Sequence, residues 1–287
     1  YQNSKECSGT EIGVQFKKKS GFDITRQYIV TAEQLGRLLE ACYEQGTLKD
    51  NKYDILEKLK EEKNAIILAH YYVDEEVQKI ADYIGDSFYL AKVGSQTEAD
   101  RIVFAGVEFM GESAKILNPN KKVLMPDAFA DCPMAHMITI KEIKEMREKY
   151  DDLAVVCYIN STAEIKQYAD VCVTSSNAVK IVKALPQKNI FFIPDQNLGD
   201  FVRKQVPEKN VMTNYGHCPR HTNITLDKLN EAKQKYPEAK IAVHPECKRE
   251  IVEAADFVGS TSAIIDYVVQ TNAKDFIIGT VDGVFAK

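Results

Sequence analysis

Short hydrophobic runs alternate with amphipathic stretches along most of the chain, and this pattern occurs three times. The first hydrophobic run of each copy covers residues 65–69, 155–159 or 241–243. Runs this short and this apolar predict buried parallel strands rather than helices. Each run is followed by a short helix, an Ala-Asp pair, a second strand and another helix. The pattern therefore predicts an α/β fold.

The Ala-Asp pairs give the length of the repeat, because Ala81, Ala169 and Ala255 lie 88 and 86 residues apart. A period of this length corresponds to a small α/β unit. We therefore predict three homologous α/β/α units with parallel sheets, related by a pseudo-threefold axis, and an incomplete third unit. The predicted boundaries are 51–135, 136–221 and 222–287, after an N-terminal extension of unassigned role at 1–50.

Further strands and helix starts complete each predicted unit. Two more strands follow in the first copy and two in the second, whereas the third copy has one before the sequence stops. Capping boxes, which mark helix starts, are predicted at Thr139–Glu142 and Ser161–Glu164. The predicted further strands are 101–105, 121–126, 189–194, 210–214 and 275–279.

Polar or aromatic pairs end the first strand of every copy. Residues two apart in an extended chain point the same way, so each pair faces one side at the carboxyl end of its strand. Ligands of open α/β sheets bind outside these strand ends. A single histidine there is more often a satisfied polar residue, but threefold recurrence favours a functional role. The pairs are His70 and Tyr72, Tyr158 and Asn160, and His244 and Glu246.

The second strand of every copy also ends in small hydroxyl residues. Serine and threonine cap helix N-termini, and these termini attract anions. The pattern predicts anion-binding positions, although capping alone would also explain the residue types. The candidates are Ser87, Ser175, Ser260 and Thr261.

Composition narrows the class of protein. The 287 residues are 45% hydrophobic and 28% charged, with a net charge of −5, which is typical of a globular protein. The negative charge disfavours nucleic acid and membrane surfaces as partners, and no apolar run is long enough to span a bilayer. Seven scattered cysteines, an odd number, favour reduced thiols and a cytoplasmic location.

Two cysteines follow the repeat. Cys132 and Cys218 lie 86 residues apart, and each precedes a proline. The same period predicts a third cysteine at about position 304, beyond Lys287. Three thiolates could hold an iron–sulfur cluster with one iron open to substrate. Two alternatives remain: a zinc site that adds His136 and His221 to the two cysteines, and two buried free thiols.

Nine short motifs, in order from about residue 53 to the end, resemble those of quinolinate synthase, the iron–sulfur enzyme of NAD biosynthesis. The motifs are AHYY at 69–72, GDS at 85–87, GVEFM at 106–110, CPMA at 132–135, YINST at 158–162, TSSNA at 174–178, GHCP at 216–219, HPEC at 244–247 and GST at 259–261.

The resemblance implies a reaction and its site. Iminoaspartate and dihydroxyacetone phosphate condense to quinolinate, with a [4Fe-4S] cluster as Lewis acid on an axis between three domains. It implies Cys132 and Cys218 as cluster ligands, and an iminoaspartate-producing enzyme as partner. By the same resemblance, Tyr72, Glu246 and His244 are catalytic. The implied substrate-binding residues are His70, Ser87, Tyr158, Asn160, Ser175, Ser260 and Thr261.

The sequence departs from the family pattern in three places. First, the first 50 residues have no counterpart. Second, the family has Gly-Thr-Glu and then Gly at the place of Thr280-Val281-Asp282-Gly283. Third, the third cysteine lies outside the 287 residues. We therefore expect this chain alone to hold a cluster poorly. Cys247 is not an obvious substitute for the third cysteine, because it does not follow the spacing of the repeat. Two other hypotheses are a cluster-free degenerate binding module of the same fold and an electron-transfer iron–sulfur protein.

Overall fold

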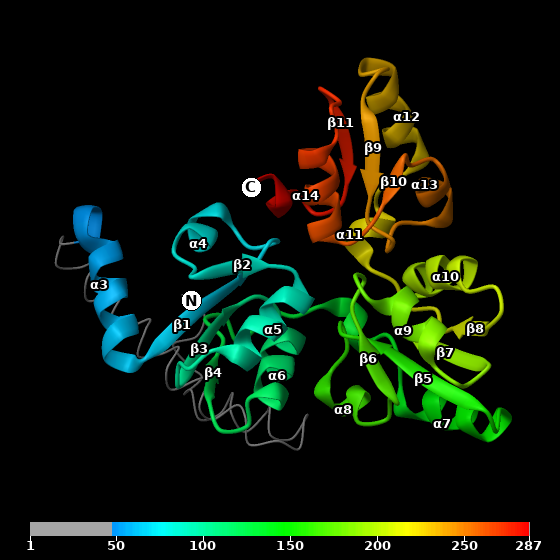
Figure 1. Cartoon of the computed structure of the whole chain (residues 1–287), viewed down its shortest axis with the longest axis horizontal. Coiled ribbons are helices and arrows are strands. Elements are labelled where there is room, and N and C mark those ends of the chain that lie inside the picture. The colour runs from blue at the N-terminus through cyan, green and yellow to red at the C-terminus, as the bar shows by residue number, and fades with distance from the viewer. Residues whose placement is uncertain (1–47, 287) are drawn as a thin grey trace. The chain divides into compact units, whose positions relative to one another are not determined.

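A computed structural model of the chain describes residues 48–286, so most of the predicted N-terminal extension lies outside the described residues. These residues form three sheets in which every strand pair is parallel. They divide into two compact units between Asp131 and Cys132. The first unit holds one sheet and the second holds two (Figure 1). The domain boundaries proposed from the repeat stay a prediction.

The sheet of the first unit has four strands in the order β2-β1-β3-β4. Its strands are β1 (Ala65–His70), β2 (Tyr83–Gly85), β3 (Arg101–Ala105) and β4 (Lys122–Leu124). Its helices are α3 (Leu48–Lys63), α4 (Glu75–Lys79), α5 (Ser87–Gln96) and α6 (Glu108–Leu117). β1 is buried over its last four residues, as a central strand with neighbours on both sides should be.

The second sheet repeats this order as β6-β5-β7-β8. Its strands are β5 (Leu153–Tyr158), β6 (Val171–Val173), β7 (Asn189–Ile193) and β8 (Asn210–Thr213). Its helices are η1 (Pro133–His136), α7 (Ile140–Lys149), α8 (Ala163–Lys166), α9 (Ala178–Ala184) and α10 (Gln196–Gln205). Alternate residues of β5 enter two different cores, one with α7 and α8 and one with α9 and α10, which makes three layers (Figure 1).

The third sheet has three strands among the described residues, in the order β10-β9-β11. They are β9 (Lys240–Val243), β10 (Phe257–Val258) and β11 (Phe276–Gly279). The helices are α11 (Pro219–Thr222), α12 (Leu226–Lys235), α13 (Arg249–Glu253), α14 (Thr261–Gln270) and η2 (Asp282–Ala286). The common strand order confirms the predicted α/β fold with three parallel sheets.

The Ala-Asp pairs have a structural reason. In every copy the aspartate Oδ2 accepts the backbone N–H of a first-strand residue 15 positions earlier, at 2.7 Å, 2.7 Å and 2.9 Å. The aspartate N–H in turn donates to the carbonyl of that same residue. The aspartates therefore fix the start of each second strand against the first. The pairs are Asp82 with Ile67, Asp170 with Val155, and Asp256 with Ile241.

The helix caps agree only partly with the predictions. The capping box at Thr139–Glu142 is confirmed. The box predicted at Ser161–Glu164 is wrong, because Thr162 caps α8 by accepting the N–H of Ile165. Ser260 caps α14 as expected, but Asp86 rather than Ser87 caps α5. Asn177 precedes α9, so Ser175 lies too far before the helix to cap it.

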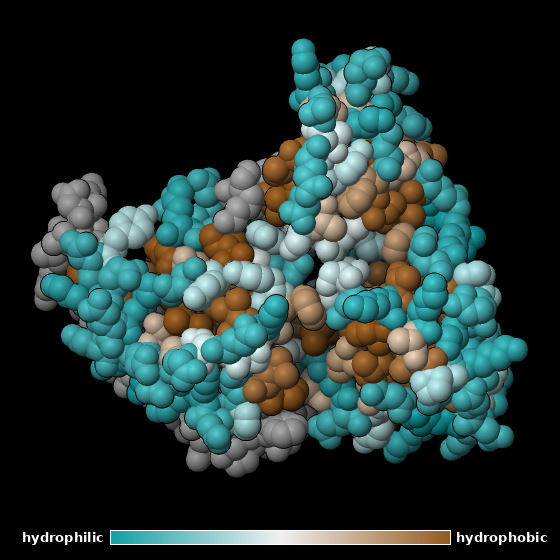
Figure 2. All heavy atoms as spheres, viewed as in Figure 1, coloured by the Kyte–Doolittle hydropathy of each residue, from teal (hydrophilic) through white to brown (hydrophobic). Residues whose placement is uncertain are grey.

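Amphipathic helices cover the sheets. α7 buries Ile143 and α12 buries Leu229, and both helices present mostly charged residues to the outside, which appear hydrophilic in Figure 2. Within the second unit, ion pairs join α10 to α13: Arg249 contacts Asp200, and Lys204 contacts Glu253. None of the described helices is long and apolar enough to cross a membrane.

Candidate active site

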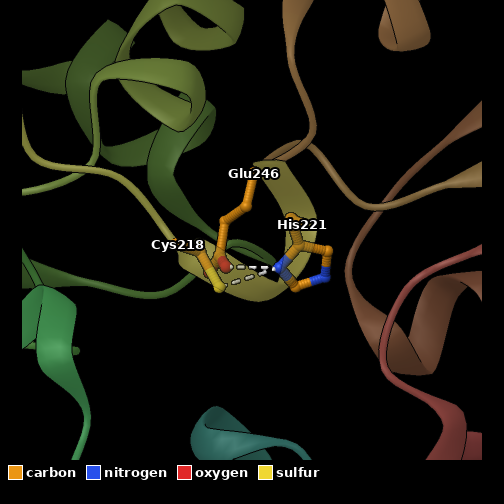
Figure 3. Close-up of side chains that lie close together, drawn as sticks. All are labelled: Cys218, His221 and Glu246. Carbon is orange, nitrogen blue, oxygen red and sulfur yellow. Dashed lines mark hydrogen bonds and ion pairs between the residues drawn. The ribbon is translucent and has the colours of Figure 1, made fainter. Parts of the chain in front are cut away.

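Glu246 is the centre of the candidate site in the second unit. It lies just beyond β9, and its side chain is almost fully buried. Tyr158, the last residue of β5, donates its hydroxyl to Glu246 Oε1 at 2.5 Å. His221, from α11, places Nδ1 2.8 Å from Glu246 Oε2 and 3.1 Å from Cys218 Sγ (Figure 3). The site therefore joins the carboxyl ends of strands from two sheets.

The charge of Glu246 is fixed by these neighbours. Burial alone would raise its pKa, but the charges of His221 and His244 and the hydrogen bonds from His221 and Tyr158 hold the pKa well below its usual range. His221 is the nearer of the two imidazoles, because its Nδ1 lies 2.8 Å from Glu246 Oε2, while its Nε2 lies 3.1 Å from the Thr280 hydroxyl. Glu246 is thus a buried anion with two donors on its oxygens.

His244 has a different arrangement. Its Nδ1 accepts the backbone N–H of Glu246 at 3.3 Å, and its Nε2 lies 3.2 Å from the Ser175 hydroxyl. The Ser175 hydroxyl can donate to this nitrogen or accept from it, depending on where the ring carries its protons. The ring stacks on His221 with centroids 4.7 Å apart. His244 therefore connects the Glu246 loop to the loop after β6.

A second buried carboxyl lies near the first. Asp195 precedes α10 and is fully buried, and its Oδ1 accepts the N–H groups of Asn197 and Leu198 at 2.8 Å. Burial and the charge of Glu246 raise the pKa of Asp195 well above its usual value. The Asn197 side chain donates to the Glu246 carbonyl at 3.1 Å. The pKa values of the two carboxyls are therefore shifted in opposite directions, an arrangement typical of acid–base sites.

The first unit carries its own strand-end residues. His70 ends β1 and is buried, and its Nδ1 accepts the backbone N–H of Tyr72 at 3.2 Å. The two rings meet edge to face with centroids 4.5 Å apart. Ser87 is the first residue of α5 and is partly exposed. The His70 contact repeats the one between His244 and Glu246, so the two copies share this local geometry.

The remaining predicted residues occupy loops of the second unit. Asn160 lies after β5, and its buried Oδ1 has no hydrogen-bond partner among the described residues. Ser260 and Thr261 are buried at the start of α14, where the Ser260 hydroxyl accepts the N–H of Ala263. An unsatisfied buried amide oxygen in a native structure usually has a partner that is missing, such as a ligand.

Comparison with known proteins places the chain in a family. The family model described as quinolinate synthetase A protein matches residues 54–287. The chain belongs to the quinolinate synthase family. It is 60% identical over 231 residues to the quinolinate synthase of Fusobacterium nucleatum, covering 80% of this chain and 77% of the relative. It is 55% identical over 229 residues to that of Caldicellulosiruptor saccharolyticus, covering 80% and 76%.

These are enzymes of NAD biosynthesis, and the chain is an enzyme of this family. A third quinolinate synthase, from Clostridioides difficile, is 49% identical over 236 residues, covering 82% of this chain and 77% of the relative. The resemblance stated from the motifs is thereby confirmed. Family membership does not by itself assign a role to any one residue of this chain.

The cysteines can be tested against the cluster that this family implies. Cys132 and Cys218 are equivalent: each precedes a proline at the start of a short helix, is partly exposed, and packs on the same hydrophobic cluster of the second unit. Burial and Glu246 raise the pKa of Cys218 far above its usual value. A bound cation reverses such a penalty, so the pair fits a metal cluster.

Cys247 does not fit the cluster. It is buried in the core under β9, where its thiol donates to the Gly279 carbonyl at 3.4 Å. Burial, with a smaller effect of Glu246, raises the pKa of Cys247 to about 12. The zinc alternative stays a prediction. Two of its four predicted ligands, Cys218 and His221, do lie close together. Their ligand atoms and one of Glu246 are within 4.8 Å of one another.

Sequence reasoning gave too little weight to two residues. His221 was considered only as a zinc ligand, although it contacts Glu246, Thr280 and Cys218. The available signal was its position three residues after a repeat-matched cysteine. Asp195 was not singled out at all. It lies just beyond the end of β7, as the other residues of the site lie at or just beyond the ends of their own strands. A search of every strand end would have found it.

Proposed function

We propose that this chain catalyses the quinolinate synthase reaction, in which iminoaspartate condenses with dihydroxyacetone phosphate and phosphate and water are released. One observation carries the proposal: a buried Glu246 carboxylate lies between the Tyr158 hydroxyl and the His221 ring, beside the thiol of Cys218. A binding module would not need a buried anion with two proton-bearing neighbours. The contacts therefore support an enzyme over a degenerate binding protein.

Cys132 and Cys218 are the proposed protein ligands of a [4Fe-4S] cluster. When bound, such a cluster supplies an open iron that binds and polarises a substrate oxygen or nitrogen. In the first two sheets each cysteine follows the fourth strand. By the same rule the third thiol would follow a fourth strand of the third sheet.

Proton transfer is assigned to Tyr72, and Glu246 receives a narrower role. A general base works best with a pKa near the working pH, whereas the pKa of Glu246 is held far below it. Glu246 is therefore a fixed anion that orients the Tyr158 hydroxyl and stabilises positive charge on His221. Tyr72 moves protons during triose isomerisation and ring closure, and His244 is a further catalytic residue.

The substrate-binding proposal rests on chemistry that the two substrates share. A dicarboxylate and a phosphate need neutral donors, which the strand-end hydroxyls and imidazoles provide. The unsatisfied Oδ1 of Asn160 is an acceptor, so it suits an imine N–H or a triose hydroxyl. The proposed binding residues are His70, Ser87, Tyr158, Asn160, Ser175, Ser260 and Thr261.

Two wider expectations follow from this function. Imines hydrolyse in water, so an enzyme that produces iminoaspartate should act close to this one. The five described cysteines are all free thiols, which supports a reducing compartment such as the cytoplasm.

The test is anaerobic reconstitution with iron and sulfide, followed by measurement of quinolinate formed from freshly generated iminoaspartate and dihydroxyacetone phosphate. We expect quinolinate only when both substrates are present. Tyr215→Phe is the matched control, because Tyr215 is 91% exposed. A fully loaded, folded protein that makes no quinolinate would refute the function. A complete stable cluster on the 287 residues alone would refute only the assignment of the third ligand.

A further inference from the structure

The second sheet carries a pair of thiols outside the candidate site. Cys157 on β5 and Cys172 on β6 are direct partners in the parallel ladder, so both side chains leave the same face of the sheet. Cys157 is fully buried, whereas Cys172 is exposed on the edge strand of the sheet. Neighbouring strands are about 4.8 Å apart, within the roughly 4.4–6.8 Å that separates the Cα atoms of disulfides.

The surroundings of the pair activate the exposed thiol. The hydrogen bond from Cys157 lowers the pKa of Cys172 to about 7, and the Lys166 ammonium group helps, against an opposing effect of burial. On the same face, Arg147 of α7 and Asp170 before β6 form an ion pair at 3.0 Å, and Lys144 of α7 lies over the Tyr168 ring. An exposed thiolate beside a second thiol is the usual arrangement of redox-sensitive cysteines.

We propose that Cys157 and Cys172 form a modification site, which a small-molecule disulfide such as oxidised glutathione converts to an intramolecular disulfide. The Cys172 thiolate attacks one glutathione sulfur, the glutathione S–S bond breaks, and one glutathione thiolate leaves. Cys157 then attacks the Cys172 sulfur while its proton passes to the second glutathione sulfur, which leaves as a thiol. Two cysteine thiols are oxidised, and one glutathione disulfide is reduced to two thiols.

The same geometry makes the bond reversible. Side chains that are paired across parallel strands keep their Cβ atoms near the strand spacing, above the roughly 3.8 Å that is usual for disulfides. The bond is therefore strained, and strained disulfides are reduced more easily. It would join the two strands that lead to Tyr158 and to Ser175, on the face opposite Tyr158.

Trypsin separates the two cysteines, because Lys149, Lys166 and Lys180 bound one peptide with Cys157 at 150–166 and another with Cys172 at 167–180. The full chain is incubated with oxidised glutathione, its free thiols are blocked with iodoacetamide, and the unreduced digest is weighed by mass spectrometry. We expect the two peptides to be joined, and dithiothreitol to separate them. Unmodified peptides at both positions would overturn the proposal.

Variants test the order of events. Cys157→Ala should stop at a lasting glutathione adduct on residues 167–180, and Cys172→Ser should leave residues 150–166 unmodified. Cys247→Ser, which removes a buried thiol elsewhere, should behave like the unaltered chain. The rate at which iodoacetamide alkylates Cys172 should rise with pH around pH 7 in the unaltered chain. In Cys157→Ala the same rise should occur at higher pH. A glutathione adduct that lasts equally long with and without Cys157, or an unchanged pH profile, would refute the role of Cys157.

Discussion

Tyr158→Phe is the sharpest test of the site, because it removes one oxygen atom from a buried contact. The hydroxyl donates to Glu246 Oε1 at 2.5 Å, whereas His244 Nδ1 lies 4.0 Å from that oxygen. A hydrogen bond to a charged group contributes about 1.5–3 kcal/mol. The phenyl ring keeps the packing of Tyr158 in the core cluster, so this loss should not be masked by a cavity. We expect a loss of about 2 kcal/mol, or roughly 30-fold in the opening equilibrium.

Native-state hydrogen exchange of the cluster-free protein measures this loss locally. Amides of β5 and β9 should exchange roughly 30-fold faster in Tyr158→Phe at pH 7, with little change from Tyr215→Phe. Because the pKa of Glu246 is depressed in the folded state, its contribution is complete above the unfolded pKa of about 4.3 and lost as pH falls through the folded value. The difference should therefore persist from about pH 7 to pH 5. Equal exchange in the two variants would refute the contact.

Three further predictions concern other residues. Tyr72→Phe should keep the fold and lose about 10²–10⁴ in rate of quinolinate formation, while near-normal turnover would remove Tyr72 from proton transfer. Cys218→Ser should lower the iron bound after reconstitution and Cys247→Ser should not; the reverse result would reassign the ligands. The Ile241 N–H and Lys240 lower the pKa of Asp256, so its contribution is present above an unfolded pKa of about 3.9 and lost below it. The urea unfolding midpoint of Asp256→Asn should thus lie below that of the unaltered chain at neutral pH, and the two midpoints should converge in acid. A difference between the midpoints that does not depend on pH would contradict this.

Much of the fold was readable from the sequence because it depends on local patterns. Residues 101–105 were predicted as a strand with the bounds that β3 has. The Ala-Asp period was visible because each aspartate performs the same backbone contact in its own copy. Helix caps were less predictable, since several polar residues compete for one position and the chain path decides which one reaches the free N–H groups.

The candidate site was likewise predictable from the sequence only in part. The sequence alone determined the repeat, the strand-end residues, the matched cysteines and the resemblance to a family. Only the tertiary structure joined Tyr158 to Glu246 across 88 residues, and brought His221 between that carboxylate and Cys218. It also shifted the pKa values of two buried carboxyls in opposite directions, because imidazole partners lower that of Glu246, whereas burial and the charge of Glu246 raise that of Asp195. Periodicity reports contacts within one repeat, whereas contacts between sheets depend on how the sheets pack, and no local pattern in the sequence encodes that.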